Sequence, residues 1–276
     1  MSIRKPTLAE WAYIYFHERI WGRGFFVPIT LDIDVTEIDH AWRAVGKTAP
    51  WTAIFLHAMA RTAELHPAVN RALVKPWGQA RIIDFEQVSI ALPVLGEFDG
   101  KPEARIEIVR DVHRLTLAQV KDLLRSLKTR ELKRTGTLTA FLRSWPNNLF
   151  TRAVVRFGIA WVELRPRYYE KTGAGLGLAS LITVGEPGFS ARPIALGPSG
   201  LGVTLTSPRT DENGRVWLDV GICFNHLVCR GDEAFVAGRT LWRMVTGRTE
   251  GGLAPYLPVL EDSAAPVPVT NAETSE

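Results

Sequence analysis

The residue best suited to chemistry in this sequence is His226, which stands at a predicted strand-to-helix junction. Residues 217–224 have the apolar density of a strand inside a sheet, and apolar residues recur at helical spacing from Ala234 to Val245. Residues 225–231 form the break between them. Because an imidazole exchanges protons near neutral pH, a histidine at such a turn could act as a general base. The alternative is a buried, hydrogen-bonded imidazole or an ordinary surface residue.

Two cysteines, Cys223 and Cys229, flank this histidine. A cysteine beside a histidine can be a nucleophile. Cys223 falls in the middle of the predicted strand, however, and this position favours buried thiols that serve packing. Two cysteines are too few for a disulfide framework and are typical of a reducing, cytoplasmic compartment. No histidine or cysteine cluster has the spacing of zinc ligands, so we expect no metal.

The elements that must position His226 follow from the hydrophobic pattern. Asp232 is predicted as the N-cap of the helix after the histidine, and Gly247 is predicted to end that helix. Apolar residues alternate with polar ones between residues 27 and 33, which predicts a strand with one buried face. A helix is predicted over residues 51–65, with an inward apolar stripe that ends at Leu65.

The run His226-Leu-Val-Cys-Arg230-Gly231 resembles the His-x-x-x-Asp-Gly motif of the chloramphenicol acetyltransferase-like superfamily. That group includes the catalytic cores of the dihydrolipoyl acyltransferases of 2-oxo acid dehydrogenase complexes. Here arginine stands where the family has aspartate. Further segments resemble the family in the same order along most of residues 7–250. They are Leu31-Asp-Ile-Asp-Val-Thr36, the His66-Pro67 pair followed by Asn70, Val88 to Val94, Ile108-Val-Arg-Asp111 and Arg192-Pro193 to Pro198.

The resemblance implies an α/β fold, a two-layer sandwich in which helices cover a mixed β-sheet. It also implies a homotrimer with each active site between two subunits. His226 of one chain would be the base, and Ser180 of its neighbour would donate to the oxyanion, with Thr183 as the alternative donor. The Gly-rich residues 173–181 around Ser180 have a second interpretation, because such a loop can bind phosphate through its backbone amides.

The chemistry implied by the resemblance is direct acyl transfer. A coenzyme A or carrier-protein thioester would give its acyl group to a thiol, hydroxyl or amine, with no metal and no covalently bound lipoyl group. Arg230 departs from this pattern, because the family aspartate pairs with an arginine and holds the histidine loop in shape. We consider two compensating roles for Arg230, an ion pair with Glu18 or Asp232, or a contact with a phosphate or a carboxylated acyl group.

Composition leaves three interpretations open. The 276 residues, 46% apolar and 22% charged, suit a soluble cytoplasmic protein, with one catalytic domain over residues 1–262 and a disordered tail over residues 263–276. Residues 121–170 contain 11 Lys and Arg against 4 Asp and Glu, a surplus of +7 in a chain of net charge +4, and residues 137–170 among them are interpreted as a basic amphipathic insertion. The chain could be an acyltransferase, a catalytically inactive trimeric scaffold, or a protein that contacts a membrane peripherally through this insertion. No nucleic-acid recognition motif is present.

Overall fold

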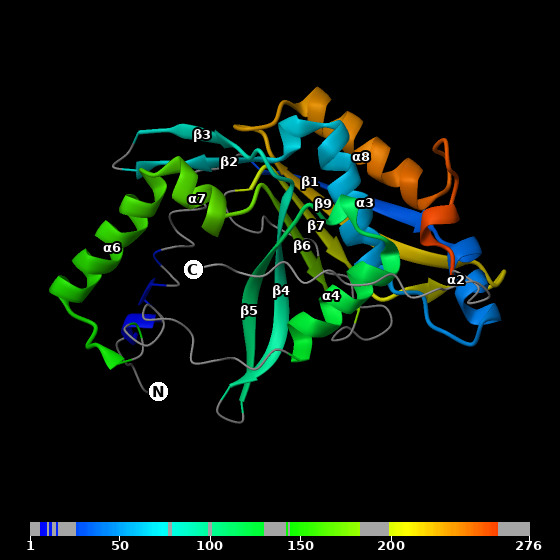
Figure 1. The fold of residues 1–276 in the computed structure, drawn as a ribbon, viewed down its shortest axis with the longest axis horizontal. Coiled ribbons are helices and arrows are strands. Elements are labelled where there is room, and N and C mark those ends of the chain that lie inside the picture. Colours follow the sequence, from blue (N-terminus) through cyan, green and yellow to red (C-terminus); the bar gives the residue numbers. More distant parts are fainter. Residues whose placement is uncertain are drawn as a thin grey trace, which may run out of the picture.

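A mixed seven-stranded sheet forms the centre of the molecule (Figure 1). The computed structural model describes residues 6–9, 11–12, 15, 26–76, 79–98, 101–129, 142, 144–182 and 199–258. The strand order is β1-β9-β7-β6-β4-β5, and β8 pairs with β9. Strand β6 is parallel to its two neighbours, and the other pairs are antiparallel. The strands are β1 (Phe26–Asp34), β4 (Ser89–Phe98), β5 (Lys101–Arg110), β6 (Leu176–Ser180), β7 (Leu201–Leu205), β8 (Arg209–Thr210) and β9 (Val216–Asn225).

Helices α3, α4 and α8 lie over one face of this sheet, so the predicted two-layer α/β architecture is confirmed (Figure 1). A second sheet has two strands, β2 and β3, and lies on the side of the molecule where α7 lies (Figure 1). The helices and the strands of the second sheet have the following bounds: α2 (Thr36–Ala44), α3 (Trp51–Leu65), η1 (Pro67–Val69), β2 (Arg71–Val74), β3 (Arg81–Asp84), η3 (Val112–Arg114), α4 (Leu117–Thr129), α6 (Leu149–Glu163), α7 (Pro166–Thr172), α8 (Gly231–Val245) and η4 (Ala254–Tyr256).

The hydrophobic pattern explains the faces of β1 and α3. In β1 the side chains of Thr30 and Asp32 are exposed while Ile33 is buried, as the alternation predicts. Helix α3 spans the predicted residues and buries ten side chains, including Ile54, Phe55 and Met59, which places it in the main core. The prediction for Leu65 was wrong. It is 56% exposed, because it is the last residue of the helix and its turn extends past the core.

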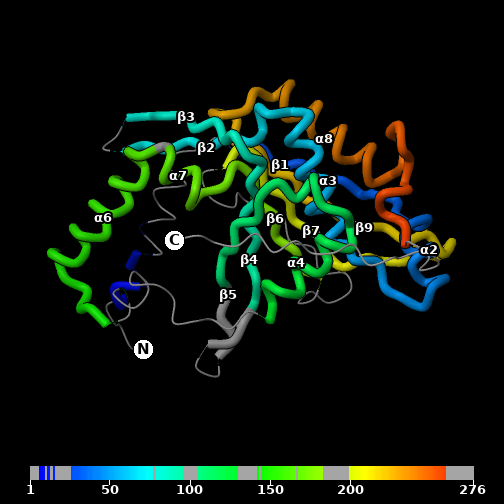
Figure 2. Tube along the Cα trace, in the orientation of Figure 1, coloured from blue at the N-terminus to red at the C-terminus, as the bar shows by residue number. Residues whose placement is uncertain are grey.

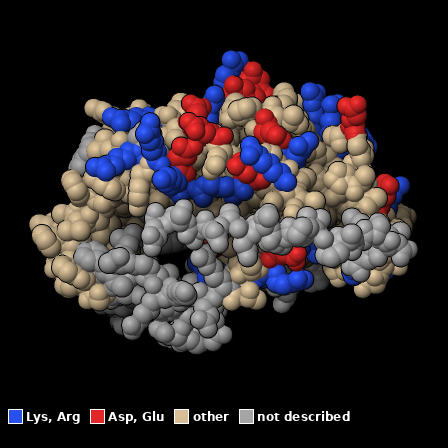
Figure 3. All heavy atoms as spheres, viewed as in Figure 1, with Lys and Arg blue, Asp and Glu red and all other residues tan. Residues whose placement is uncertain are grey.

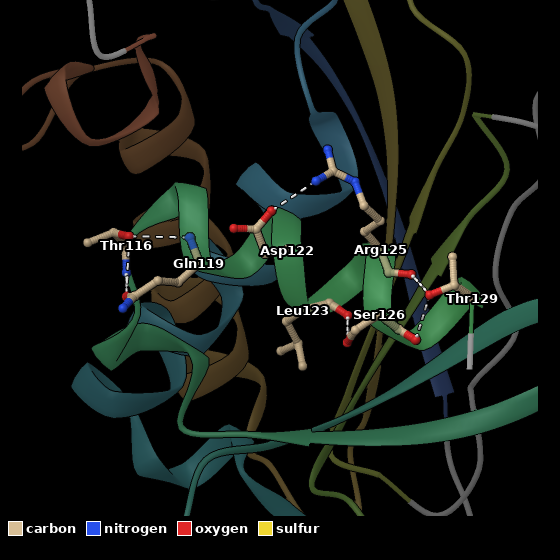
Figure 4. A network of polar contacts seen from close by, with 7 residues as sticks. All are labelled: Thr116, Gln119, Asp122, Leu123, Arg125, Ser126 and Thr129. Carbon is tan, nitrogen blue, oxygen red and sulfur yellow. Dashed lines mark hydrogen bonds and ion pairs between the residues drawn. The ribbon is translucent and has the colours of Figure 1, made fainter. Parts of the chain in front are cut away.

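A capping box begins α4 (Figure 4). The backbone N–H of Thr116 donates to Gln119 Oε1 at 2.8 Å, and the N–H of Gln119 donates to Thr116 Oγ1 at 3.3 Å. Along the exposed side Arg125 pairs with Asp122 at 3.2 Å. The two capping hydrogen bonds satisfy backbone donors at the start of the helix, while Val120 turns inward to the core.

A separate apolar cluster joins α6 to the N-terminal segment, at the end of the molecule away from α2 (Figure 2). Leu8 and Ala12 pack there against Val155. The guanidinium of Arg152 lies over the ring of Trp11, 5.2 Å from its centroid. Residues 8–9, 11–12 and 15 of this segment are helical.

Candidate active site

His226 lies immediately after β9, in a tight turn that Asn225 shapes. Asn225 is fully buried, and its side-chain Oδ1 accepts a hydrogen bond from the backbone N–H of Leu227 at 3.1 Å. Its carbonyl accepts from the N–H groups of Val228 and Cys229, both at 3.0 Å. The buried asparagine therefore fixes the turn from beneath, and His226 is exposed above it. Its ring lies 5.9 Å from that of Phe224.

The start of α8 is built closely around the imidazole. A Cβ atom added to Gly231 would lie only 3.1 Å from Nε2 of His226, so the absence of a side chain lets the ring approach the first helical turn. The N-cap is Arg230, and not Asp232 as predicted. The reason is that Glu233 accepts a hydrogen bond from the Arg230 N–H at 2.8 Å, which starts the helix earlier. Gly247, with φ +70°, follows the end of the helix as predicted.

The Arg230 side chain pairs with Asp232, which is one of the two acidic partners proposed from the sequence. A guanidinium nitrogen of Arg230 donates to Asp232 Oδ2 at 3.0 Å. Both side chains are largely exposed, 77% and 64%, so water screens the pair and it contributes little to stability. The other proposed partner, Glu18, lies outside the described residues.

Neither cysteine near His226 has the character of a nucleophile. Cys223 and Cys229 are both buried and free. Burial raises the pKa of each thiol to about 11, so both are protonated at neutral pH. The interpretation of these residues as packing thiols agrees with their burial.

Ser180 ends β6 and contacts the first turn of α3. Its hydroxyl is hydrogen-bonded to the hydroxyl of Thr52, with 2.8 Å between the two oxygens. Ser180 is partly buried, so its hydroxyl is held in place at the edge of the core. Sequence reasoning did not identify Thr52, because it is 128 residues away from Ser180 and no local pattern links them. Thr183, the alternative donor, lies outside the described residues.

Within one chain His226 and Ser180 lie at opposite ends of the strands. Ser180 is in register with Leu205 of β7, and Leu205 is in register with Val220 of β9. His226 comes six residues after Val220 along β9. At about 3.3 Å per residue, this offset is roughly 20 Å along the strand direction. One protomer therefore does not bring the two side chains together.

The Gly-rich segment before Ser180 serves close packing around Asn70. A Cβ on Gly175 would lie 2.3 Å from the side-chain oxygen of Asn70, so only glycine fits there. Asn70 itself is buried and donates to the carbonyls of Phe85, at 3.2 Å, and Gln87, at 3.0 Å. The segment thus links β6 to the entry of β4. These contacts explain Gly175 without a phosphate.

Within residues 6–76, 79–129 and 142–258, so far as the structure describes them, no group of three or more His, Cys, Asp or Glu side chains could hold a metal ion. None of the described helices is long and apolar enough to cross a membrane.

Comparison with solved structures identifies the fold. The dihydrolipoamide acetyltransferase of Azotobacter vinelandii aligns with a TM-score of 0.61 and 17% identity, over 93% of this chain and 94% of that one. The truncated catalytic core of the 2-oxoacid dehydrogenase complex from Thermoplasma acidophilum gives a TM-score of 0.60 and 12% identity, over 89% and 98%. This is the fold of the acyltransferase cores. A probable dihydrolipoamide acetyltransferase from Listeria monocytogenes gives 0.59 and 12%, over 96% and 98%.

The fold predicted from the resemblance to these acyltransferase cores is therefore confirmed, and the likeness is one of fold, at low identity. No protein-family model matches the sequence, and no curated protein matches it either. For the Azotobacter enzyme, a serine, a histidine and an asparagine four residues after that histidine were investigated for their role in catalysis. Four residues after His226 this chain has Arg230.

Proposed function

We propose that this protein is an acyltransferase that moves an acyl group directly from a coenzyme A or carrier-protein thioester to a thiol, hydroxyl or amine. The observation that carries the proposal is the position of His226, exposed on a fixed turn against the glycine that begins α8. This position occurs in a chain that has the fold of the acyltransferase cores. The identity of the acyl group and of the acceptor does not enter the proposal.

In the proposed reaction His226 removes the proton from the acceptor as the acceptor attacks the thioester carbonyl. Such general-base assistance is typically worth about 10²–10⁴-fold in rate. The hydroxyl of Ser180, held by Thr52, donates to the oxyanion of the tetrahedral intermediate. His226 then returns the proton to the departing thiolate. The acyl group passes from donor to acceptor with no covalent intermediate on the protein.

A complete site on this proposal needs two protomers. The offset of roughly 20 Å along the strands separates His226 from Ser180 in one chain, so the serine must come from a neighbour in a homotrimer. Exposed apolar side chains beside the histidine support a subunit contact there. Leu227 is 51% exposed and Phe235, one turn along α8, is 63% exposed.

Mixing two inactive variants tests this arrangement. His226→Ala and Ser180→Ala should each lower kcat by about 100-fold or more, with acetyl-CoA as donor and dihydrolipoamide as acceptor. The two variants are then unfolded and refolded together in equal amounts. One in four subunit interfaces should contain both an intact His226 and an intact Ser180. Activity should therefore return to roughly a quarter of the wild-type value. Mixed oligomers that form but regain no activity would refute the shared site.

The second candidate function is a scaffold without catalysis. The observation that favours it is Arg230, which places a cation four residues after His226, where the Azotobacter enzyme has an asparagine, and whose guanidinium pairs with Asp232 in solvent. A scaffold would lose nothing when the imidazole is removed. The test is a complementation assay in which Gly238→Ala is the control and should retain the full biological activity of the protein. If His226→Ala also retains it, the scaffold function replaces the enzymatic one.

A further inference from the structure

Arg230 follows His226 by one turn of the chain, at the junction of β9 and α8. The backbone N–H of Cys229 donates to the carbonyl of Asn225 at 3.0 Å, which is the i→i−4 hydrogen bond of a helical turn. Side chains four residues apart on such a turn are neighbours, with Cβ atoms about 5–6 Å apart. Both Arg230 and His226 are exposed. The turn therefore presents a guanidinium beside the imidazole that the proposed reaction uses as its base.

The imidazole of His226 approaches the residue that follows Arg230. Its Nε2 lies 3.1 Å from the position that a Cβ on Gly231 would occupy. In the proposed reaction the acceptor atom comes within hydrogen-bond distance of a ring nitrogen, about 2.6–3.2 Å. A group that reacts at Nε2 is therefore held beside the backbone of residues 230 and 231, and the long side chain of Arg230 can reach it.

The ion pair of Arg230 uses only part of its guanidinium. One nitrogen donates to Asp232 Oδ2 at 3.0 Å, whereas a guanidinium carries five N–H donors. The side chain of Arg230 is 77% exposed, so water screens the pair and its rearrangement costs little. The guanidinium can therefore bind a second carboxylate beside that of Asp232, or exchange one carboxylate for the other.

The other charged groups at this turn have hydrogen-bond partners of their own. Basic and acidic side chains stand side by side where α8 lies, at the top of the molecule (Figures 1 and 3). The carboxylate of Glu233 accepts from the backbone N–H of Arg230 at 2.8 Å. Arg71 lies near enough to oppose the burial that raises the pKa of the Cys229 thiol, and it pairs with Asp84. The guanidinium of Arg230 is thus the group of this turn that can take a further anion.

We propose that Arg230 binds a carboxylate that a substrate carries within a few atoms of the reacting carbonyl, on the acyl group or on the acceptor. The phosphates of coenzyme A lie at the other end of the pantetheine arm from the thioester, so they are remote from this turn. A planar guanidinium binds a carboxylate through two parallel hydrogen bonds, which orient the substrate as well as hold it. The inference rests on the proposed acyl transfer and names its substrate class, a dicarboxylic acyl group such as succinyl or a carboxylated acceptor.

Equilibrium binding of matched compounds tests the proposal without requiring turnover. The thioethers S-(2-carboxyethyl)-CoA and S-propyl-CoA have no reactive carbonyl and differ only by a carboxylate in place of a methyl group. Dihydrolipoate and dihydrolipoamide form the corresponding pair of acceptors. We expect the carboxylated member of one pair to bind the full chain at least ~10-fold more tightly than its uncharged partner, as measured by titration calorimetry. The pair that shows the preference identifies which substrate carries the carboxylate.

Variants of the turn assign the preference to Arg230. Arg230→Met should abolish it and leave the affinity for the uncharged compound within ~2-fold, and Arg230→Lys should retain only part of it, because an ammonium lacks the fork of donors. Asp232→Asn should strengthen binding of the carboxylated compound by roughly 2- to 5-fold, since it removes a competing carboxylate. Arg239→Met, at an exposed position of the same helix, is the matched control and should change neither affinity.

Equal affinities within both pairs, or a preference that survives in Arg230→Met, would overturn the proposal. So would an equal loss of affinity for both thioethers in Arg230→Met, because the guanidinium would then bind a phosphate of the coenzyme. Circular dichroism of each variant separates loss of binding from loss of fold. A preference that depends on Arg230 in a protein that turns over no thioester would leave the carboxylate site standing and refute the acyl transfer alone.

Discussion

Replacement of Gly231 by alanine tests directly whether the first turn of α8 positions the imidazole of His226. The new Cβ would lie 3.1 Å from Nε2, whereas ordinary contacts of a Cβ lie at 3.4–4 Å. The ring must therefore move by a few tenths of an ångström. A displacement of 1 Å from the reactive geometry can cost about 100-fold in rate, so a shift of 0.3–0.5 Å should cost about 4- to 10-fold.

Gly238→Ala, in the same helix, is the matched control. There the added Cβ would meet Ile222 Cδ1 at 3.8 Å, an ordinary contact, far from the histidine turn. Both substitutions replace a helical glycine by alanine. Inside the helix, at Gly238, the change should stabilise the fold by roughly 0.5–1 kcal/mol. The control should therefore raise stability and leave the rate of acyl transfer unchanged.

The assay measures kcat and KM for acetyl transfer from acetyl-CoA to dihydrolipoamide, followed by chromatography of the donor, together with urea denaturation of each variant. Gly231→Ala should lower kcat with little change in KM, because the substitution moves the base and not a binding surface. The reasoning fails if Gly231→Ala transfers acetyl groups at the wild-type rate while His226→Ala does not. It fails as well if Gly238→Ala loses as much activity as Gly231→Ala.

Four further predictions concern other residues. Thr52→Val should lower kcat of the proposed transfer about 10-fold at unchanged KM because Ser180 loses its hydroxyl partner, whereas Thr52→Ser should restore the rate. Gly175→Ala should lower the free energy of unfolding by about 1–3 kcal/mol in urea titrations, since the Cβ has no room. Burial, with smaller contributions from nearby cations, lowers the pKa of His57 below its ordinary value of 6.5. Stability should therefore fall as the pH drops from 6.5 through that lowered pKa, and His57→Gln should reduce the fall in pH-dependent denaturation. Iodoacetamide should modify Cys229 of the folded protein far more slowly than in urea-unfolded protein at pH 8, because the side chain is fully buried and burial raises the pKa of its thiol to about 11, and mass spectrometry would measure the difference.

The sequence predicted those helices and strands in which the repeat of apolar side chains coincides with the buried face. The alternation before Ile33 and the stripe of α3 specify which face turns inward, because one face of each must leave water. The position of the α8 N-cap was not predictable in the same way. Three polar residues compete there, and the outcome depends on Glu233 reaching the Arg230 N–H while Asp232 pairs with the guanidinium.

Long-range contacts set the other limits on prediction from sequence. The hydrogen bond between Thr52 and Ser180 joins segments that no local pattern connects. The amphipathic character of α6 could be predicted, but which of its sides packs against the N-terminal segment could not. The choice depends on the N-terminal segment, whose Leu8 packs against Val155 from the opposite end of the sequence.

The placement of His226 and Ser180 at opposite ends of one protomer has a consequence for how the proposed enzyme would respond to its own abundance. An isolated folded chain would hold both groups and turn over nothing, so specific activity would decline on dilution while circular dichroism stayed constant. A subunit that lacks both His226 and Ser180 would also inactivate two of the three active sites of a trimer, because it would contribute the histidine to one site and the serine to another. The concentration of the protein and the fraction of intact subunits would thus affect the rate of acyl transfer as strongly as the substrate concentration does.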